Sequence, residues 1–205
     1  MTKSQERARA HRLEGMPKNR QDIPKAERQA EVVECARELF VTNGFKGTSV
    51  AAVGRAAGIA PAAVHWYFPT KDDLFAAALE QLFTNARLAV QSDPEIAGNP
   101  RGELLALLAA MQPYRGLHRE AYERIESSSA VGEAYAKMQN WLDEHLLAII
   151  GNQLPAGADT SLIADTAHVL FEGLLISSRR LDRPTSDLVD LLTEALVAVA
   201  KTKAL

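Results

Sequence analysis

Apolar side chains recur every three to four residues along most of this chain, the spacing of one face of an α-helix. Alternation of apolar and polar residues, which would indicate strands, does not extend over any length. The pattern therefore predicts an all-α fold. Breaks between the periodic segments give about nine helices, at residues 25–44, 50–57, 61–67, 71–91, 101–112, 114–128, 132–151, 159–181 and 185–203.

Residues that favour helix ends lie at the boundaries of the first four segments. Gly44 and Gly58 each follow an apolar helical run, and glycine accepts the left-handed backbone that commonly ends a helix. Pro61 suits the first position of the third helix, because the N–H that proline lacks has no helical partner there. Thr70 is a capping residue for the fourth helix. The first four helices are therefore expected to be joined by short turns.

The second and third helices meet across one of these turns. Gly58 permits the positive φ that a tight turn needs, and Gly54 is small where the two helices approach. The apolar positions that would hold them crossed are Val53, Ala57, Ile59 and Val64. Two short helices held in this way form a helix-turn-helix, whose second helix lies in the major groove of DNA.

Charge is distributed unevenly along the chain. Residues 1–71 hold 12 Lys and Arg against 7 Asp and Glu, a net charge of +5, whereas residues 72–205 hold 11 against 19, a net charge of −8. A basic N-terminal third on an acidic body suggests a polyanionic partner at that end. Residues 1–24 are predicted to form a flexible basic arm, which either follows DNA or only improves solubility.

The remaining composition narrows the class of protein. Cys35 is the single cysteine, so no intrachain disulfide forms, which fits a reducing compartment. No apolar stretch approaches the ~20 residues that cross a bilayer, and the N-terminus lacks the apolar segment of a signal peptide. The sequence therefore predicts a cytoplasmic protein without a membrane partner.

Enzymes and adaptors are the two alternatives to a DNA-binding function. The sequence has no phosphate-binding loop, no Gly-x-Ser-x-Gly and no His-Glu-x-x-His, so we expect no catalytic site, cofactor or metal. His118, His145 and His168 lie on separate predicted helices, where core or surface roles are favoured over a metal site. A helical adaptor without DNA binding is disfavoured by Arg55, Lys71 and the basic arm.

Residues 44–75 resemble the DNA-binding region of the TetR/AcrR family of bacterial regulators. The order and spacing of the matching residues agree without a gap, and the resemblance covers about residues 25–85. The matching residues are Gly44, Phe45, Thr48, Ser49, Val50, Val53, Ala57, Gly58, Ile59, Val64, Tyr67, Phe68, Pro69, Lys71, Leu74 and Phe75. The resemblance implies a three-helix DNA-binding domain at 25–85, with its helix-turn-helix at 49–68, and a ligand-binding and dimerisation domain at 86–205.

The resemblance also implies which residues contact double-stranded DNA. Thr48 and Ser49, at the start of the second helix, would donate to a phosphate, and Lys71 would pair with another. The third helix would face the groove through Pro61, Ala62, Ala63, His65 and Trp66, with Tyr67 at its end close to the backbone.

Two features of the third helix depart from common family members. It offers no Arg, Gln or Asn for a bidentate base contact, so base choice must depend on His65, Trp66, DNA shape or the arm. His65 also stands where the family often has Tyr. Since the unperturbed histidine pKa is about 6.5, we expect DNA affinity to rise as pH falls below that value.

In the body, the resemblance implies a pocket for a small apolar or aromatic effector between the helices. Ordinary core packing is the alternative for each pocket residue. The pocket candidates are Met111, Tyr114, His118, Tyr122, Tyr135, Met138, Trp141 and Phe171.

The last two predicted helices are apolar on more than one side, and the resemblance implies that they pair with a second copy of the chain. The residues expected at this dimer interface are Leu162, Val169, Leu170, Gly173, Leu188, Leu192 and Leu196. A homodimer would address a near-palindromic operator, and an effector would release it, so that the protein acts as a repressor.

Overall fold

The computed structural model describes residues 24–176 and 182–203, and this part of the chain holds nine α-helices and no strand. The predicted all-α fold is confirmed. The predicted basic arm and the last residues of the predicted helix 159–181 lie outside the described residues. No helix in the described ranges is long and apolar enough to cross a membrane.

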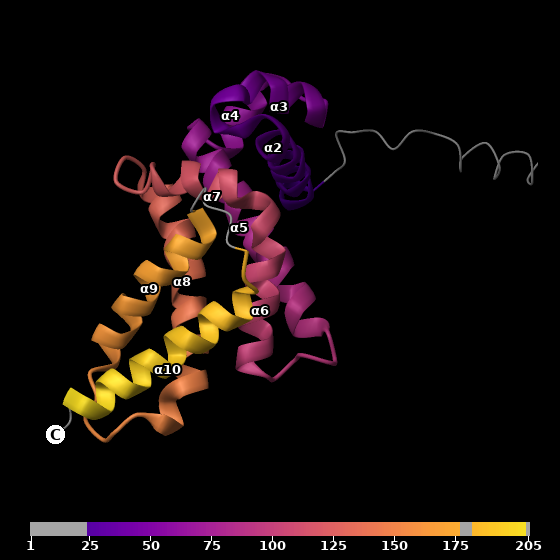
Figure 1. Ribbon diagram of the computed structural model, residues 1–205. Coiled ribbons are helices and arrows are strands. Elements are labelled where there is room, and N and C mark those ends of the chain that lie inside the picture. The colour runs from indigo at the N-terminus through magenta and orange to yellow at the C-terminus, as the bar shows by residue number, and fades with distance from the viewer. Residues whose placement is uncertain (1–23, 177–181, 204–205) are drawn as a thin grey trace, which may run out of the picture.

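Three helices gather at one end of the molecule, which we call the head (Figure 1). They are α2 (Lys25–Gly47), α3 (Val50–Ala57) and α4 (Pro61–Tyr67). Helix α5 (Lys71–Ser92) begins beside them and continues into the remainder of the molecule, the body. It packs against α2 near its start and against body helices further along. The predicted domain boundary at residue 85 falls within this helix, which joins head and body as one continuous rod.

The body consists of five helices, with the long α8 in contact with α5, α6, α7 and α9. They are α6 (Pro100–Met111), α7 (Arg115–Tyr122), α8 (Ser129–Ile150), α9 (Thr160–Ile176) and α10 (Thr185–Lys203). Arg101 ties α6 to α10, since its Nε and Nη2 donate to the two carboxylate oxygens of Asp190 at 2.7 and 2.6 Å.

One predicted connection in the body was wrong. The predicted helix 114–128 ends at Tyr122 as α7, and the next helix begins at Ser129 rather than at Gly132. The hydroxyl oxygen of Ser128 accepts a hydrogen bond from the Val131 N–H at 3.3 Å and so caps α8. This cap outweighs the low helix propensity of Gly132, which lies in the first turn of the helix.

Three aromatic rings form the centre of the head. Phe40 and Phe45 of α2 pack edge-on against Phe75 of α5, with ring centroids 4.9 and 5.0 Å apart. Phe40 and Phe75 are almost completely buried. Aromatic pairs in this geometry add to the stabilisation that comes from burial alone, so this cluster fixes α5 on the head.

Gly44 ends the first helical segment of α2, as predicted, and a second short segment follows it across a kink. The Gly44 backbone has φ 70° and ψ 177°, and the second segment continues to Gly47. The positive φ agrees with the prediction, but the predicted left-handed cap was wrong, because that conformation has ψ near 47°. A Cβ at this position would lie 3.0 Å from the Glu120 carboxylate, so both the backbone and the space favour glycine.

A buried carboxylate fixes the start of α6 against α8. Glu103 accepts hydrogen bonds from the backbone N–H of Gly98 at 2.6 Å and from His145 Nε2 at 2.8 Å. The hydrogen bond from His145 is the main cause that lowers the pKa of the Glu103 carboxyl, and burial opposes it. A lowered carboxyl pKa stabilises the fold above the unfolded-state pKa, and this stabilisation is lost as pH falls through the folded-state value.

We therefore expect Glu103→Gln to lower the free energy of unfolding at pH 7 by about 1–3 kcal/mol, the contribution of a hydrogen bond to a charged group. The loss should shrink between pH 5 and pH 3, where the wild-type carboxylate becomes protonated. Urea unfolding across this range measures it, with exposed Glu126→Gln as the control. An equal loss at pH 7 and pH 3 would contradict the assignment.

Candidate nucleic-acid interface

The turn between α3 and α4 has the geometry that the sequence predicts. Gly58 is left-handed, with φ 67° and ψ 32°. A Cβ on Gly54 would lie 3.0 Å from the Ile59 carbonyl oxygen, so only glycine allows this approach. Val53 and Val64 are completely buried between the crossed helices. The predicted helix-turn-helix is therefore present, and among the residues that the structure describes its packing leaves the opposite face of α4 exposed.

That exposed face of α4 carries the predicted groove contacts. Pro61, Ala62, His65 and Trp66 are exposed. Their spacing of one and four residues places them on one side of the helix. Ala63 and Tyr67 are half-buried beside them. The structure thus brings the predicted contacts of this helix together into a narrow strip, which we call the α4 strip.

Of the two predicted phosphate donors at the start of α3, only Ser49 is exposed. The Ser49 hydroxyl oxygen accepts from the Ala52 N–H at 3.1 Å, which leaves its own hydrogen free to donate. Thr48 is buried, and its hydroxyl lies 3.0 and 2.9 Å from the carbonyl oxygens of Leu39 and Gly44. The predicted phosphate contact of Thr48 is withdrawn, because that hydroxyl already bonds to the end of α2.

Trp66 dominates the α4 strip, with 64% of its surface exposed. The ammonium of Lys25, at the start of α2, lies 4.1 Å from the centre of its ring, and Tyr67 packs edge-on at 4.9 Å. A cation over an aromatic face is attracted to it. Lys25 therefore adds positive charge beside the α4 strip. In the sequence, its charge and its position next to the basic arm were the only signals of this role.

Lys71, predicted to bind phosphate, points toward the inside of the head. Its ammonium lies 4.1 Å from the centre of the Phe45 ring. Burial is the main cause that lowers the pKa of Lys71, followed by the nearby charge of Arg124. To reach a phosphate, this side chain would have to leave the aromatic ring, so its predicted contact stays a prediction.

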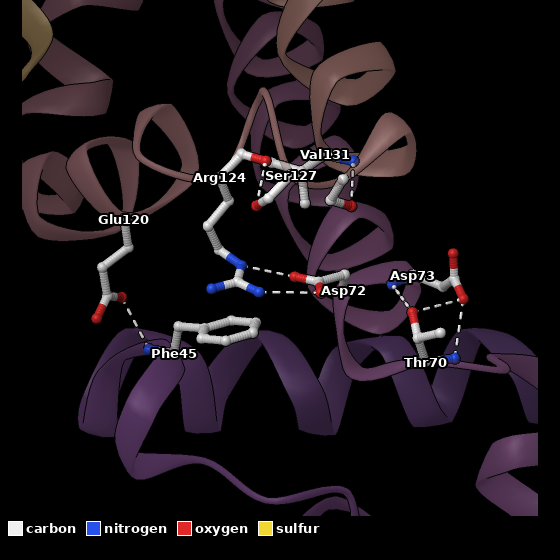
Figure 2. Close-up of polar contacts among 9 residues, drawn as sticks. Phe45, Thr70, Asp72, Asp73, Glu120, Arg124, Ser127 and Val131 are labelled. Carbon is white, nitrogen blue, oxygen red and sulfur yellow. Dashed lines mark hydrogen bonds and ion pairs between the residues drawn. The ribbon is translucent and has the colours of Figure 1, made fainter.

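The end of α7 and the turn after it contact the same corner of the head (Figure 2). Arg124 donates through Nε and Nη2 to both carboxylate oxygens of Asp72, at 2.6 and 2.9 Å, and its guanidinium lies 3.8 Å from the Phe45 ring centre. Glu120 accepts from the Phe45 N–H at 2.8 Å. We call these contacts the junction, because they connect the body to both helices that flank the helix-turn-helix.

A capping box fixes the start of α5 next to the junction. Thr70 accepts from the Asp73 N–H at 3.1 Å, while the Asp73 carboxylate accepts from the Thr70 N–H at 2.8 Å. The predicted cap by Thr70 is thus confirmed. Because Asp73 makes this cap, Asp72 is available to bind Arg124. The head and the body therefore meet at a helix start that the capping box already holds rigid.

One ring nitrogen of His65 already makes a hydrogen bond within the chain. Its Nδ1 lies 3.1 Å from the carbonyl oxygen of Pro69, which can only accept, so Nδ1 carries the hydrogen. In the neutral ring Nε2 is then an acceptor and repels a phosphate oxygen. Protonation turns Nε2 into a charged donor. The pH-dependent DNA contact that the sequence predicts for His65 stays a prediction.

The eight predicted pocket residues divide into separate groups. Met111, His118, Tyr135 and Met138 line one void between α5, α6, α7 and α8. Trp141 lines a neighbouring groove, and Tyr114 lines a different one beside Phe40. Tyr122 is exposed, and Phe171 is buried without lining the void.

The predicted dimer residues also differ in their exposure. Leu162, Val169 and Leu170 of α9 are exposed, as is Gly173. On α10, Leu188 is half-buried, and Leu192 and Leu196 are buried. An apolar groove of about 490 Å³ runs between the two helices, lined in part by Leu162, Leu170, Leu192 and Leu196.

No three His, Cys, Asp or Glu side chains in the described part of the chain come close enough to hold a metal ion. His118, His145 and His168 lie in separate environments. Burial and the neighbouring Glu38 raise the pKa of the Cys35 thiol, the opposite of what a reactive cysteine needs.

Residues 32–78 match the family model described as bacterial regulatory proteins, tetR family. The chain is 27% identical over 183 residues to the HTH-type transcriptional repressor AcnR of Corynebacterium jeikeium (strain K411), covering 85% of this chain and 95% of that protein. It is 29% identical over 83 residues to the HTH-type transcriptional regulator AcrR of Shigella flexneri. That match covers 40% of this chain and 39% of that protein.

Solved structures share the fold across head and body. A tetR-family transcriptional regulator from Streptomyces coelicolor superposes with a TM-score of 0.66 at 21% identity, covering 88% of this chain and 85% of that one. A transcriptional regulator from Rhodococcus sp. Rha1 gives 0.60 at 21% identity, covering 85% and 96%.

Proposed function

Since this chain is a transcriptional regulator of the tetR family, we propose that it binds a near-palindromic DNA operator as a homodimer and represses transcription until a small molecule releases it. Its domains would then be an arm at 1–24, a DNA-binding domain at 25–85 and a ligand-binding and dimerisation domain at 86–205. Such a protein works beside the DNA, in the bacterial cytoplasm.

The α4 strip is the observation that carries the DNA-binding part of this proposal. It is an exposed helix face on a helix-turn-helix, flanked by the free hydroxyl of Ser49 and by Lys25. Its apolar residues suit thymine methyl groups, while Trp66 Nε1 and His65 Nε2 supply its polar contacts. Phosphate contacts from Ser49 and Lys71 would set the register of the head on the duplex.

The apolar groove between α9 and α10 supports the homodimer. Val169 has 66% of its surface exposed and Leu170 has 46%, so residues 24–176 and 182–203 leave much of both side chains uncovered. A contiguous apolar face of this kind marks a protein interface in soluble proteins. Pairing across a two-fold axis would bury the groove and bring two heads onto one duplex.

The junction supports release by an effector bound in the body. Glu120 lies near the end of α7 and Arg124 lies in the turn that follows it, and they contact Phe45 and Asp72 of the head. A ligand that shifts α7 would therefore turn the head relative to the body, and two heads at the wrong spacing would no longer fit one operator. Repression is proposed because it is also the role in the name of the relative AcnR.

Fluorescence anisotropy of the full chain on DNA that flanks its own gene tests the proposal. We expect tight binding that survives scrambled competitor DNA and weakens linearly with the logarithm of salt concentration. Salt-dependent binding without sequence preference would show that the operator does not lie in the DNA beside the gene. Failure to bind DNA at low salt would overturn the proposal in favour of an adaptor or an enzyme.

Trp66→Ala gives the sharper test of the α4 strip. Because Trp66 is exposed, its loss should leave the melting temperature within about 2 °C of the wild type, while operator affinity falls about tenfold or more. Val41→Ala is the matched control, since Val41 is an exposed apolar residue that borders the body side of α2. Equal affinity of the two variants would exclude Trp66 from the interface.

A further inference from the structure

A small void lies in the body where α5, α6, α7 and α8 meet. Its volume is about 20 Å³, room for about one water molecule. Six apolar side chains line it, among them Phe83, Met111 and Met138, together with the two polar side chains His118 and Tyr135. Flexible methionines adapt to the shape of whatever they pack against, so this void can enlarge without breaking the helices.

Two buried polar atoms in its lining have no partner. His118 Nε2 and Tyr135 Oη make no hydrogen bond, although each residue has only 4% of its surface exposed. Buried polar atoms are almost always satisfied in folded proteins, and those that are not require an explanation. Both atoms belong to the lining of the same void, so one small polar group placed there could satisfy them together.

The charge of the lining limits what that group can be. No Lys, Arg, Asp or Glu lines the void. Burial lowers the pKa of His118 to about 4, so its ring is neutral at pH 7, and burial raises the pKa of the Tyr135 phenol, which also stays neutral. A charged group inside the void would lose its hydration and find no counter-charge there, since the charged side chains of this region line only the neighbouring surface groove. A hydroxyl in the void can both donate and accept.

Phe83 lines both the void and a neighbouring surface groove. A surface groove of about 330 Å³ between α5 and α8 shares Phe83 and Ala134 with the void. Phe83 is half-buried and packs edge-on against Trp141, with ring centroids 6.2 Å apart. The ion pair of Glu80 and Lys137, at 2.5 Å, lies in the rim of the groove. Rotation of the Phe83 ring would join the two spaces.

We propose that the void and the groove form one binding site for a compact, uncharged aromatic molecule with a hydroxyl group, which enters past Phe83 and bonds to His118 and Tyr135. The ring would pack among Phe83, Met111 and Met138. The identity of this molecule as the effector rests on the proposed function, but its binding does not. His118 lies two residues from Glu120, so a ligand held by His118 acts directly on the helix of the junction.

Isothermal titration of the full chain with three matched probes tests the site: p-cresol, toluene and 4-methylbenzoate. We expect p-cresol to bind about tenfold more tightly than toluene, the effect of a hydrogen bond in a site without water, and 4-methylbenzoate not to bind. Tyr135→Phe should reduce the preference for p-cresol, because only the hydrogen bond to His118 remains. The same variant without ligand should melt no lower than the wild type, because it removes an unpaired buried hydroxyl.

Tyr114→Phe is the control, since this half-buried tyrosine lines a different groove and should keep the preference. Equal binding of p-cresol and toluene, no binding of either, or an undiminished preference in Tyr135→Phe would overturn the proposal. The same titration repeated on the DNA complex separates it from the proposed function. Binding of p-cresol without release of DNA would count against effector control and leave the site in place.

Discussion

Leu170→Glu should turn the protein into a monomer and weaken its operator binding by about 10²- to 10⁴-fold, because two linked heads gain that much from binding one duplex together. Leu170 lies in the apolar groove between α9 and α10. In a two-fold interface the substitution occurs twice, so two carboxylates would be buried without counter-charges.

Sedimentation velocity gives the oligomeric state, and anisotropy on a full operator and on a half-site gives the affinity. The half-site affinity should change little, because the head is untouched. Leu88→Glu is the matched control, since Leu88 has 50% of its surface exposed on α5 and does not line the groove. A dimeric Leu170→Glu variant, or a monomeric Leu88→Glu variant, would exclude the groove as the dimer interface.

Phe75→Ala should lower the free energy of unfolding by about 3–5 kcal/mol, the usual cost of removing a buried phenyl ring. Phe75 is completely buried and contacts both Phe40 and Phe45 edge-on. Little can move in to fill the space, because the same rings fix α5 on the head. Phe45 also lies against Arg124 and Lys71, so the loss should loosen the junction as well.

Urea unfolding at a fixed protein concentration measures this loss, because the stability of a dimer depends on concentration. Phe75→Leu should cost distinctly less, since it keeps most of the buried volume. Val41→Ala, at an exposed position, should change stability by less than about 0.5 kcal/mol. A loss below 1 kcal/mol for Phe75→Ala would show that the aromatic cluster does not hold the head together.

Local sequence determined the helices and the turn of the head. Apolar periodicity located nine helices, and Gly54, Gly58, Pro61 and Thr70 each act within a few residues of their own position. Such interactions depend on neighbours in the chain, so they can be derived without the fold. The exposed side of α4 could also be predicted from the sequence, since burial of the apolar Val64 places Trp66 on the outside of the helix.

Only the tertiary structure decided which partner each polar or aromatic side chain meets. The Thr48 hydroxyl was unavailable because Gly44 interrupts α2 and brings two carbonyl oxygens within its reach. Arg124 lies in a segment predicted to be helical, but Asp72, 52 residues away in the chain, is its partner. Local patterns fix helices because their hydrogen bonds are local, whereas the junction and the void exist only where distant helices meet.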